Sequence, residues 1–297
     1  MKNAFNSFDR LGNIAIAKFS PSTKLSDKKQ FADKIMHDNP SIKTVLEKIR
    51  GFKGRLRKQK TSWIAGEKTK EVLYRENGCV FRFNTDSTYF SPRLSNERKE
   101  IAGMIKPGDI VLVMFAGVAP FPIVLEKNSK SKKVVSVEIN REANKYAKLN
   151  VELNKVKNRV EIVQGDVRKF AWKIGSLRSH IPTRPPKRNF NVKEIRKLTI
   201  NDKKRMELEN IPSKYDVIVM PRPQLKYSFL EEAFALSKKG TRIFYYDFTP
   251  ISEKEKIVEK IKMEAKKARK KIKILKVKSA GEIAPYKIRL RVDFKIL

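Results

Sequence analysis

The segment Asp109-Ile-Val-Leu-Val-Met-Phe-Ala-Gly-Val-Ala-Pro-Phe121 carries the clearest structural signal in the chain. It begins as an apolar run typical of a buried strand and continues as a turn of small residues that leads into a helix. In an open α/β sheet, ligands bind at the carboxyl ends of strands, and small residues let the backbone approach a ligand closely. The turn with Phe115 and Gly117 is therefore a candidate ligand site. An ordinary tight turn between a strand and a helix is the alternative interpretation.

The rest of the C-terminal part alternates strands with helices. Between the strands we expect helical segments, one with Ala143, Tyr146, Leu149 and Leu153 along its packed side. This alternation predicts the α/β class with a seven-stranded, mostly parallel sheet. The connection before the last strand is too short for a helical crossover, so that strand should pair antiparallel. The strands after the first are expected at 134–138, 160–163, 216–220, 241–247, 272–277 and 288–296.

The N-terminal part predicts two smaller domains. Residues 1–50 contain an expected strand at Ile14–Phe19 and an expected helix from about Ser26 to Lys48. Residues 51–106 begin with a basic linker at 51–60 and continue with a hairpin, for which Asn77-Gly78 is a strong turn signal. The third domain is expected at 107–297. It contains an insertion at 167–214 with 14 Lys and Arg against 4 Asp and Glu, and we interpret this insertion either as a solvated segment or as an arm that grips RNA.

The charge of the chain points to a polyanionic partner. The 297 residues include 68 Lys and Arg against 32 Asp and Glu, a formal net charge of +36. Nucleic acid is the partner that such a surplus favours, because neutralised phosphates release counterions; an anionic membrane is the weaker alternative. One cysteine, Cys79, and two histidines exclude an intrachain disulfide and a Cys-rich or multi-His metal site. Without a long apolar run, we expect a cytoplasmic protein that does not enter the membrane.

Two acidic residues strengthen the candidate ligand site. Glu138 ends the second expected strand, where a carboxylate can accept both ribose hydroxyls of a nucleoside-type cofactor. Asp166 ends the third strand. Each acid alone is more often an ordinary polar strand end, but together with Gly117 they fit adenosine binding in a methyltransferase-like fold. No Lys-Ser or Lys-Thr pair follows a glycine loop, so a phosphate cradle of the P-loop type is not indicated.

A set of longer motifs resembles one known family, the archaeal branch of the tRNA (guanine-37-N1)-methyltransferases. The resemblance runs from Leu11-Gly-Asn-Ile-Ala15 to Asp293-Phe-Lys-Ile296. The motifs that carry it are Glu76-Asn-Gly-Cys79, Tyr89-Phe-Ser-Pro-Arg-Leu94, Asn96-Glu-Arg98, Met114-Phe-Ala-Gly-Val-Ala-Pro-Phe121, Gly165-Asp-Val-Arg168, Met220-Pro-Arg-Pro223 and Phe244-Tyr-Tyr246.

The resemblance implies a class I fold that uses S-adenosylmethionine, preceded by a small domain that recognises tRNA and by a linking domain. It also implies a monomer that acts on the purine at position 37 of the anticodon loop. The catalytic roles fall on Glu97, as the base, and Arg57, near the guanine O6. The cofactor-binding roles fall on Tyr89, Arg98, Phe115, Gly117, Glu138, Asp166 and Pro221, and the substrate-binding roles on Arg93, Pro223 and Tyr246.

The chain departs from the family pattern at three places. Val113 replaces an aspartate, Ala119 replaces a second glycine, and Pro221 replaces an asparagine expected to contact guanine. The last change resembles a subgroup that also methylates C7 of 4-demethylwyosine at the same nucleotide, to give isowyosine. Two alternatives stay open at this point: transfer of an aminocarboxypropyl group to the same precursor, and a non-catalytic RNA-binding protein.

The chemistry at guanine N1 explains why an acid and a cation are needed. N1 carries a proton in the neutral base, so a base must remove it and a positive group must stabilise the charge on O6. The family match assigns these roles to Glu97 and Arg57; without it, Glu97 would be taken as a helix-opening acid after Ser95-Asn96 and Arg57 as a phosphate contact. Tyr89, Phe90, Tyr245 and Tyr246 are candidate stacking surfaces, and a sheet-core role is the alternative for at least one of the last two.

Overall fold

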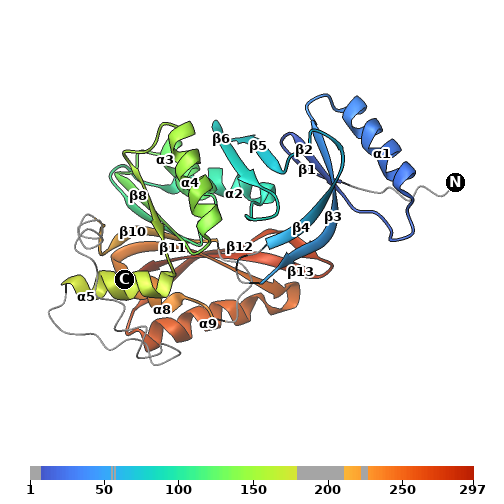
Figure 1. The fold of residues 1–297 in the computed structure, drawn as a ribbon. Coiled ribbons are helices and arrows are strands. Elements are labelled where there is room, and N and C mark those ends of the chain that lie inside the picture. Colours follow the sequence, from blue (N-terminus) through green and yellow to red (C-terminus); the bar gives the residue numbers. More distant parts are fainter. Residues whose placement is uncertain (1–7, 55, 57, 179–210, 222–226) are drawn as a thin grey trace, which may run out of the picture. The chain divides into compact units, whose positions relative to one another are not determined.

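The computed structural model describes residues 8–54, 56, 58–178, 211–221 and 227–297 (Figure 1). The chain divides into two compact units. Unit 1 comprises residues 1–104, 116–129 and 140–162, and unit 2 comprises residues 105–115, 130–139 and 163–297.

The N-terminal part of unit 1 is a four-stranded sheet in the order β1-β2-β3-β4. β1 (Phe8–Leu11) pairs antiparallel with β2 (Ile14–Ala17), β2 pairs parallel with β3 (Thr44–Lys53), and β3 pairs antiparallel with β4 (Lys58–Gly66). Helix α1 (Leu25–Asp38) connects the parallel pair, as a crossover must. Its buried Ala32 and Ile35 pack in one cluster with Ala15, Val45 and Ile64 of the strands.

The helix expected from Ser26 to Lys48 is wrong in its second half, because α1 ends at Asp38. Asn39 follows, and its backbone N–H and side-chain amide both donate to the carbonyl of Ile35 (3.0 and 3.1 Å). Pro40 then disfavours the helical conformation of the residue before it. The basic stretch 51–60 likewise contains the end of β3 and the start of β4, so the sheet continues past residue 50 to Gly66.

The second part of unit 1 starts with the hairpin predicted at Asn77-Gly78, which is confirmed. β5 (Glu71–Glu76) pairs antiparallel with β6 (Cys79–Asn84), and the two turn residues have φ of 48° and 72°. Both values lie in the left-handed region that a two-residue turn of this kind requires. Cys79 is buried beside the turn, and burial raises the pKa of its thiol to about 11. The chain continues through η1 (Pro92–Leu94) into α2 (Ser95–Met104).

Two asparagine side chains form hydrogen bonds along one edge of this hairpin. They are Asn150, on α4 (Arg141–Leu153), and Asn154, at the C-cap of the same helix. The Asn150 amide accepts from the N–H of Arg82 (2.7 Å) and donates to its carbonyl (3.0 Å). Asn154 does the same with Val80 (2.9 and 2.6 Å). The side chains therefore replace a neighbouring strand and satisfy backbone groups that an open edge would leave unpaired.

The asparagines also correct the expected packing of this helix. Of the residues expected on the packed side, Ala143 is buried and Tyr146 and Leu149 are half-buried, but Leu153 is 43% exposed. The buried residues of α4 are Ala143, Asn144, Ala147, Asn150 and Val151. The inward side of the helix thus combines small apolar residues with the amide that bonds β6, and Leu153 lies outside it.

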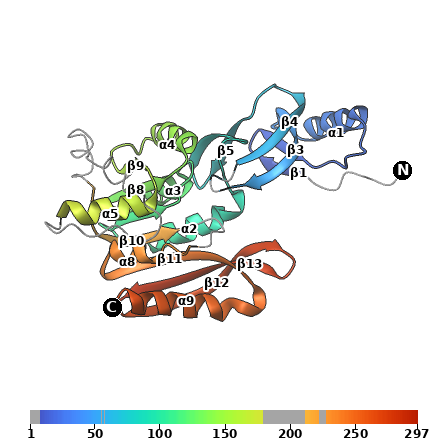
Figure 2. The same cartoon turned by 60° about the horizontal axis from the view of Figure 1, so that its bottom comes forward.

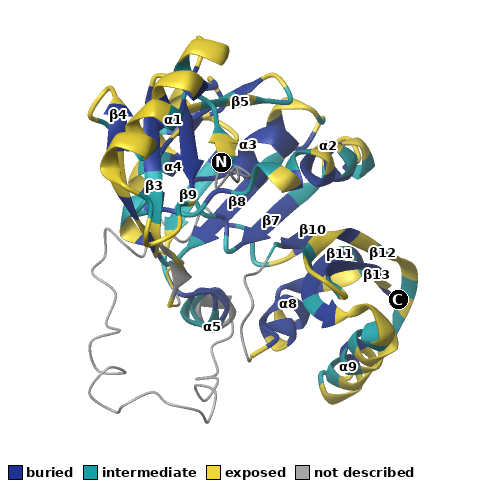
Figure 3. Cartoon of the chain, turned by 90° about the vertical axis from the view of Figure 1, so that its right-hand side faces the viewer, coloured by how far each residue is buried: buried dark blue, intermediate teal, exposed yellow. Residues whose placement is uncertain are grey.

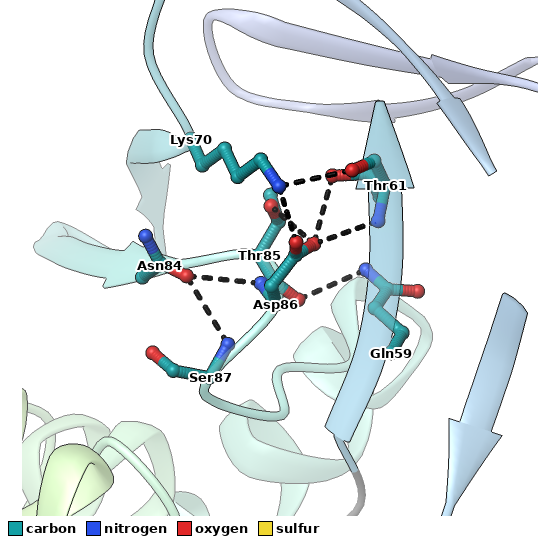
Figure 4. A network of polar contacts seen from close by, with 7 residues as sticks. All are labelled: Gln59, Thr61, Lys70, Asn84, Thr85, Asp86 and Ser87. Carbon is teal, nitrogen blue, oxygen red and sulfur yellow. Dashed lines mark hydrogen bonds and ion pairs between the residues drawn. The ribbon is translucent and has the colours of Figure 1, made fainter. Parts of the chain in front are cut away.

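A polar network joins β4 to the loop that follows β6 (Figure 4). The Asp86 carboxylate accepts from the backbone N–H of Thr61 (3.1 Å), from its hydroxyl (2.7 Å) and from Lys70 (2.5 Å). Asn84 accepts from the N–H groups of Asp86 (3.0 Å) and Ser87 (3.1 Å) and so fixes the turn. This network ties the N-terminal sheet to the segment that leads into Tyr89.

Unit 2 is built on a seven-stranded sheet in the order β12-β13-β11-β10-β7-β8-β9. β7 pairs parallel with both β8 and β10, and β10 pairs parallel with β11. β13 pairs antiparallel with β11 and β12, which confirms the predicted mostly parallel sheet with an antiparallel last strand. The strands are β7 (Ile110–Met114), β8 (Lys133–Glu138), β9 (Val160–Gln164), β10 (Tyr215–Met220), β11 (Ser237–Pro250), β12 (Ile272–Ala284) and β13 (Lys287–Ile296).

Helices cover one face of this sheet. α8 (Leu230–Ala235) and α9 (Lys254–Lys267), which follows η2 (Ile251–Glu253), lie along the strands β10 to β13 (Figures 1 and 2). Ile261 and Ala265 of α9 pack in one core with Leu290 and Val292 of β13, while the outer side of α9 is exposed (Figure 3). α5 (Val167–Arg178) adds Phe170 to the same core. Most of the predicted basic insertion, residues 179–210, lies outside the described residues.

No helix in the described ranges is long and apolar enough to span a bilayer.

We predict that Asn150→Ala lowers the free energy of unfolding by about 1–3 kcal/mol, because the partly buried backbone groups of Arg82 and the buried carbonyl of Val118 lose their partner. Denaturant unfolding followed by circular dichroism measures the change. Asn158→Ala, at an exposed position after the helix, is the matched control and should be neutral. Equal stability of the two variants would contradict the asparagine-held edge.

Candidate active site

The turn after β7 has three residues with left-handed backbone. Phe115, Gly117 and Ala119 have φ of 58°, 59° and 66°. Glycine adopts this conformation freely, whereas for the other two it costs on the order of 1 kcal/mol each. α3 (Pro120–Lys127) begins directly after Ala119. Strained residues of this kind cluster at ligand-binding turns, which supports the sequence-based choice of this segment.

Contacts within unit 1 fix the second half of the turn. Asn150, which holds β6, also donates to the carbonyl of Val118 (3.0 Å). A Cβ placed on Gly117 would lie 3.3 Å from the backbone oxygen of Tyr89. Gly117 and Tyr89, both predicted from sequence to bind the cofactor, therefore lie side by side, and the space for a side chain between them is very tight.

A buried ion pair anchors the motif that follows Tyr89. The side chain of Arg98 is 1% exposed, and its Nε and Nη2 donate to the two carboxylate oxygens of Glu76. Nη2 also donates to the carbonyl of Ser91 (3.1 Å). The rings of Phe90 and Phe121 lie 5.2 and 5.5 Å from the guanidinium carbon. The cofactor contact predicted for Arg98 stays a prediction; the contacts in the structure assign it to holding this motif in place.

Glu76 is a residue that sequence reasoning did not assign to the site. It belongs to the motif Glu76-Asn-Gly-Cys79, in which the turn residues Asn77-Gly78 were interpreted and the acid was given no role. The carboxylate is 3% exposed, and burial of a charged group requires a charged, hydrogen-bonded partner. The local sequence does not show that this acid is buried, so it could not indicate the arginine partner 22 residues away.

Glu97 and Arg93 belong to the segment that this anchor holds. Glu97 is in the first turn of α2 and is 6% exposed, directly before Arg98 in the chain. Arg93 has a side chain that is 71% exposed and lies 3.9 Å from Asp9. The anchored arginine thus fixes the helix that presents the predicted base, and the exposed arginine remains accessible to a large substrate.

In unit 2, the strand ends bring Glu138 and Asp166 close in the fold. The carbonyl of Glu138 accepts from the N–H of Gly165 (2.8 Å), the residue before Asp166. The Asp166 carboxylate accepts from the N–H (2.8 Å) and from Nη2 (2.9 Å) of Arg168. This hydrogen bond raises the pKa of the Arg168 guanidinium. Asp166 therefore caps the start of α5, and its adenine-side role stays a prediction.

A second cluster in unit 2 surrounds Phe115. The Phe115 ring lies 4.8 Å from that of Phe229, which lies 4.9 Å from that of Tyr227. The Tyr227 hydroxyl donates to Glu231 (3.0 Å) and lies 3.2 Å from Glu232. Glu232 is buried, its Oε2 has no hydrogen-bond partner among the residues that the structure describes, and burial raises the pKa of its carboxyl to about 7. Sequence reasoning missed this acid, because one glutamate in a Glu-Glu pair carries no distinguishing pattern.

The remaining predicted residues divide as follows. Pro221 directly follows β10 and is half-buried. Tyr246 and its neighbour Tyr245 are both completely buried. This favours the sheet-core interpretation for both tyrosines, and the substrate contact of Tyr246 stays a prediction. Arg57 and Pro223 lie outside the described residues.

Among the described residues, no group of three or more His, Cys, Asp or Glu side chains could hold a metal ion.

Comparisons with known proteins match the chain to one family. A model of the TRM5/TYW2 methyltransferase domain matches residues 72–181, and a model of the TYW2 N-terminal domain matches residues 1–69. The chain is 33% identical over 307 aligned positions to the tRNA (guanine(37)-N(1))/4-demethylwyosine(37)-methyltransferase Taw22 of Nanoarchaeum equitans, with 98% of this chain and 100% of the relative covered. The chain belongs to the TRM5/TYW2 methyltransferase family.

Other members support the assignment to the TRM5/TYW2 family. The tRNA (guanine(37)-N(1))-methyltransferase Trm5b of Pyrococcus abyssi is 31% identical, with 98% of this chain and 74% of the relative covered. The crystal structure of wild-type Trm5b from the same organism has a TM-score of 0.76, 30% identity and the same shares covered. The family resemblance and the methyltransferase fold expected from the motifs are thus confirmed.

We predict that Gly117→Ala destabilises the protein, because it adds left-handed strain and a Cβ at 3.3 Å from the Tyr89 carbonyl oxygen. We expect a loss of about 1–2 kcal/mol in unfolding free energy. Ala119→Gly, in the same turn, is the opposite control: it relieves strain at φ 66° and should be neutral or stabilising. Chemical denaturation measures both, and a destabilised Ala119→Gly with an unaffected Gly117→Ala would refute this account of the turn.

We also predict that Glu232 makes stability depend on pH. Its pKa is about 7 in the fold against 4.5 for the ordinary group, so the folded state holds a proton that the unfolded chain releases between these values. Stability should therefore fall as pH rises through this window, with a slope of up to about 1.4 kcal/mol per pH unit, and level off above it.

Glu232→Gln should abolish this contribution, because the amide does not titrate. The exposed neighbour Glu231 provides the matched control: Glu231→Gln should leave the pH dependence in place. The groups that act on Glu232 are Glu231, Tyr227 and Arg168. Unfolding curves measured between pH 4 and 9 test the effect. The upper limit lies about two pH units above the pKa of Glu232 in the fold, so the levelling-off is included. Identical pH profiles for wild type and Glu232→Gln would contradict the assignment.

Proposed function

We propose that this chain is a tRNA methyltransferase that transfers the methyl group of S-adenosylmethionine to N1 of guanosine-37, and to C7 of 4-demethylwyosine at the same position. The observation that carries the proposal is the left-handed turn at Gly117 packed against Tyr89. It supplies close backbone approach at a strand end, which a nucleoside cofactor needs. The names of the relatives, which include both a guanine(37) and a 4-demethylwyosine(37) activity, support the choice of substrate.

The residues present fit the cofactor. Gly117 leaves a place where a Cβ would be crowded, and the apolar ring of Phe115 precedes it in the same turn. Glu138 would accept the ribose hydroxyls, as acids at the end of a second strand do in such sheets. Asp166 would lie on the adenine side. When bound, the sulfonium supplies an electrophilic methyl group, and this chain's own residues supply position and proton transfer.

Glu97 is the residue we propose as the base. Removing the N1 proton of guanine makes N1 a nucleophile, and the negative charge then spreads to O6. Burial of Glu97 at 6% exposure lets its carboxylate act with little competition from water. Arg57 is proposed as the cation near O6, and the exposed Arg93 as a contact to the tRNA. The target purine must leave its stack in the anticodon loop to reach this acid.

The domain organisation expected from sequence is part of the proposal. We assign tRNA recognition to the N-terminal domain that contains the four-stranded sheet, substrate and cofactor motifs to the linking segment up to residue 106, and the transfer reaction to residues 107–297. The charge of +36 favours phosphate contacts along all three. A monomeric state and a cytoplasmic place of action belong to the same proposal.

Glu97→Ala tests the mechanism. We expect the rate of N1 methylation to fall by about 10²–10⁴-fold, the usual contribution of a positioned base. The affinity for S-adenosylmethionine, measured by isothermal titration, should stay unchanged. Lys99→Ala changes an exposed residue on the same helix and is the matched control. Wild-type methylation by Glu97→Ala would show that Glu97 is not the base.

The product identifies the reaction. Unmodified tRNA and tRNA carrying 4-demethylwyosine are incubated with labelled cofactor, digested to nucleosides and analysed by mass spectrometry. Methyl groups on both bases support the proposal. An aminocarboxypropyl group, which is much heavier, would replace it with the alternative transferase, and the absence of any product would favour a non-catalytic RNA-binding protein.

A further inference from the structure

Three strands of unit 2 continue past the point where their neighbour stops. β10 ends at Met220, which pairs with Tyr245 of β11. β11 runs on to Pro250, paired throughout with β13, whose first residue is Lys287. At about 3.4 Å per residue, these extra residues extend the sheet by roughly 17 Å. We call the part formed by residues 246–250 and 278–291 the projecting wing.

The wing points to the side of the sheet where the ligand should bind. β7, β10 and β11 are parallel, so their carboxyl ends share one edge. Phe115 follows β7 and Pro221 follows β10 at that edge. The turn between β12 and β13 contains Pro285 and Tyr286 and lies beside Pro250, beyond the same edge. The wing tip is therefore on the substrate side of the sheet.

Tyr286, at the tip, has an unusual combination of properties. Its side chain is 84% exposed, so the ring adds little to the folded core. Its φ is 58°, in the left-handed region where turns normally use Gly, Asn or Asp. The backbone is nevertheless fixed, because the carbonyl of Tyr286 accepts from the N–H of Ile251 (3.0 Å). A rigid backbone thus presents an aromatic ring to solvent at a conformational cost.

Two lysines lie beside the tip. Lys287 directly follows Tyr286 and pairs with Pro250. Lys254 begins α9 three residues after Ile251, whose N–H donates to the carbonyl of Tyr286. Positive charge together with an exposed ring is the pattern that single-stranded nucleic acid binds.

We propose that the ring of Tyr286 stacks on an unpaired base of the tRNA anticodon arm, while Lys254 and Lys287 contact its phosphates. The choice of RNA rests on the proposed function, and the choice of the anticodon arm follows from the position of the tip on the substrate side. Loop bases of RNA are splayed out and stack on aromatic side chains. The wing then holds the arm beside the strand ends while the target purine turns into the site.

Three variants at one position test the stacking. Tyr286→Asn keeps a residue that tolerates the left-handed turn but removes the ring. Tyr286→Phe keeps the ring and removes the hydroxyl. Tyr286→Ala removes both the ring and the hydroxyl, and alanine disfavours the left-handed backbone at this position. The affinity for an anticodon-arm RNA is measured by fluorescence anisotropy without cofactor, together with the thermal midpoint and the affinity for S-adenosylmethionine.

Loss of one stacked base should weaken RNA binding by about tenfold for Tyr286→Asn, since stacking contributes about 1–3 kcal/mol. Tyr286→Phe should bind as the wild type does, and Tyr286→Ala should lose at least as much as Tyr286→Asn. Wild-type affinity of Tyr286→Asn would overturn the proposal. Equal loss in Tyr286→Phe would overturn stacking in favour of a hydroxyl contact.

A separate measurement tests the proposed contacts between the lysines and the RNA phosphates. The double change Lys254→Ala and Lys287→Ala should reduce the slope of log Kd against log salt by about one per lost phosphate contact. An unchanged slope would remove these two lysines from the interface. The stacking proposal and the proposed function can fail independently. If the wild type binds the arm through Tyr286 but makes no methylated product, the stacking proposal stands and the methyltransferase proposal falls.

Discussion

The bidentate pair between Arg98 and Glu76 holds together the segments on which the candidate active site depends. It joins the β5–β6 hairpin to α2, and the same guanidinium binds the carbonyl of Ser91 inside the motif. Both charges are almost fully buried, so removal of either partner would leave an unpaired charge and cost about 3–5 kcal/mol. The position of Glu97, one residue before Arg98, is thereby fixed with a precision that an exposed helix end would not provide.

Open strand edges impose the second constraint on unit 1. Asn150 and Asn154 satisfy β6, and Asn150 also reaches the turn at Val118, so one side chain links the hairpin with the candidate cofactor turn. Asp86 performs a related task for β4 with three donors. Amide and carboxylate groups thus carry connections that apolar packing carries elsewhere, and they make the arrangement specific as well as stable.

Much of this fold could be predicted from local patterns. The apolar runs, the Asn77-Gly78 turn and the antiparallel last strand depend on neighbours in sequence or on short connections, and these were confirmed. The small-residue turn at Gly117 was also found correctly, because left-handed backbone favours glycine. In contrast, the end of α1 depended on Asn39 and Pro40, a signal outweighed by the apolar spacing that continues to Ile42.

What local patterns could not predict were pairs formed across long stretches of chain. The inward side of α4 includes the amide of Asn150, which bonds the backbone of β6 68 residues earlier. The partner of Arg98 is likewise 22 residues away. Strand ends marked Glu138 and Asp166, yet the capping of α5 by Asp166 and the burial of Glu232 depend on packing between elements.

The burial of Cys79 has a practical consequence. It is the only cysteine in the chain, its side chain is 1% exposed, and its pKa of about 11 keeps it in the thiol form at neutral pH. Because the thiolate is the reactive species, oxidants and maleimides should leave the native protein untouched. A cysteine placed on the surface would then be the single labelling position, so a fluorophore or a cross-linker could report on a chosen element without any background substitution.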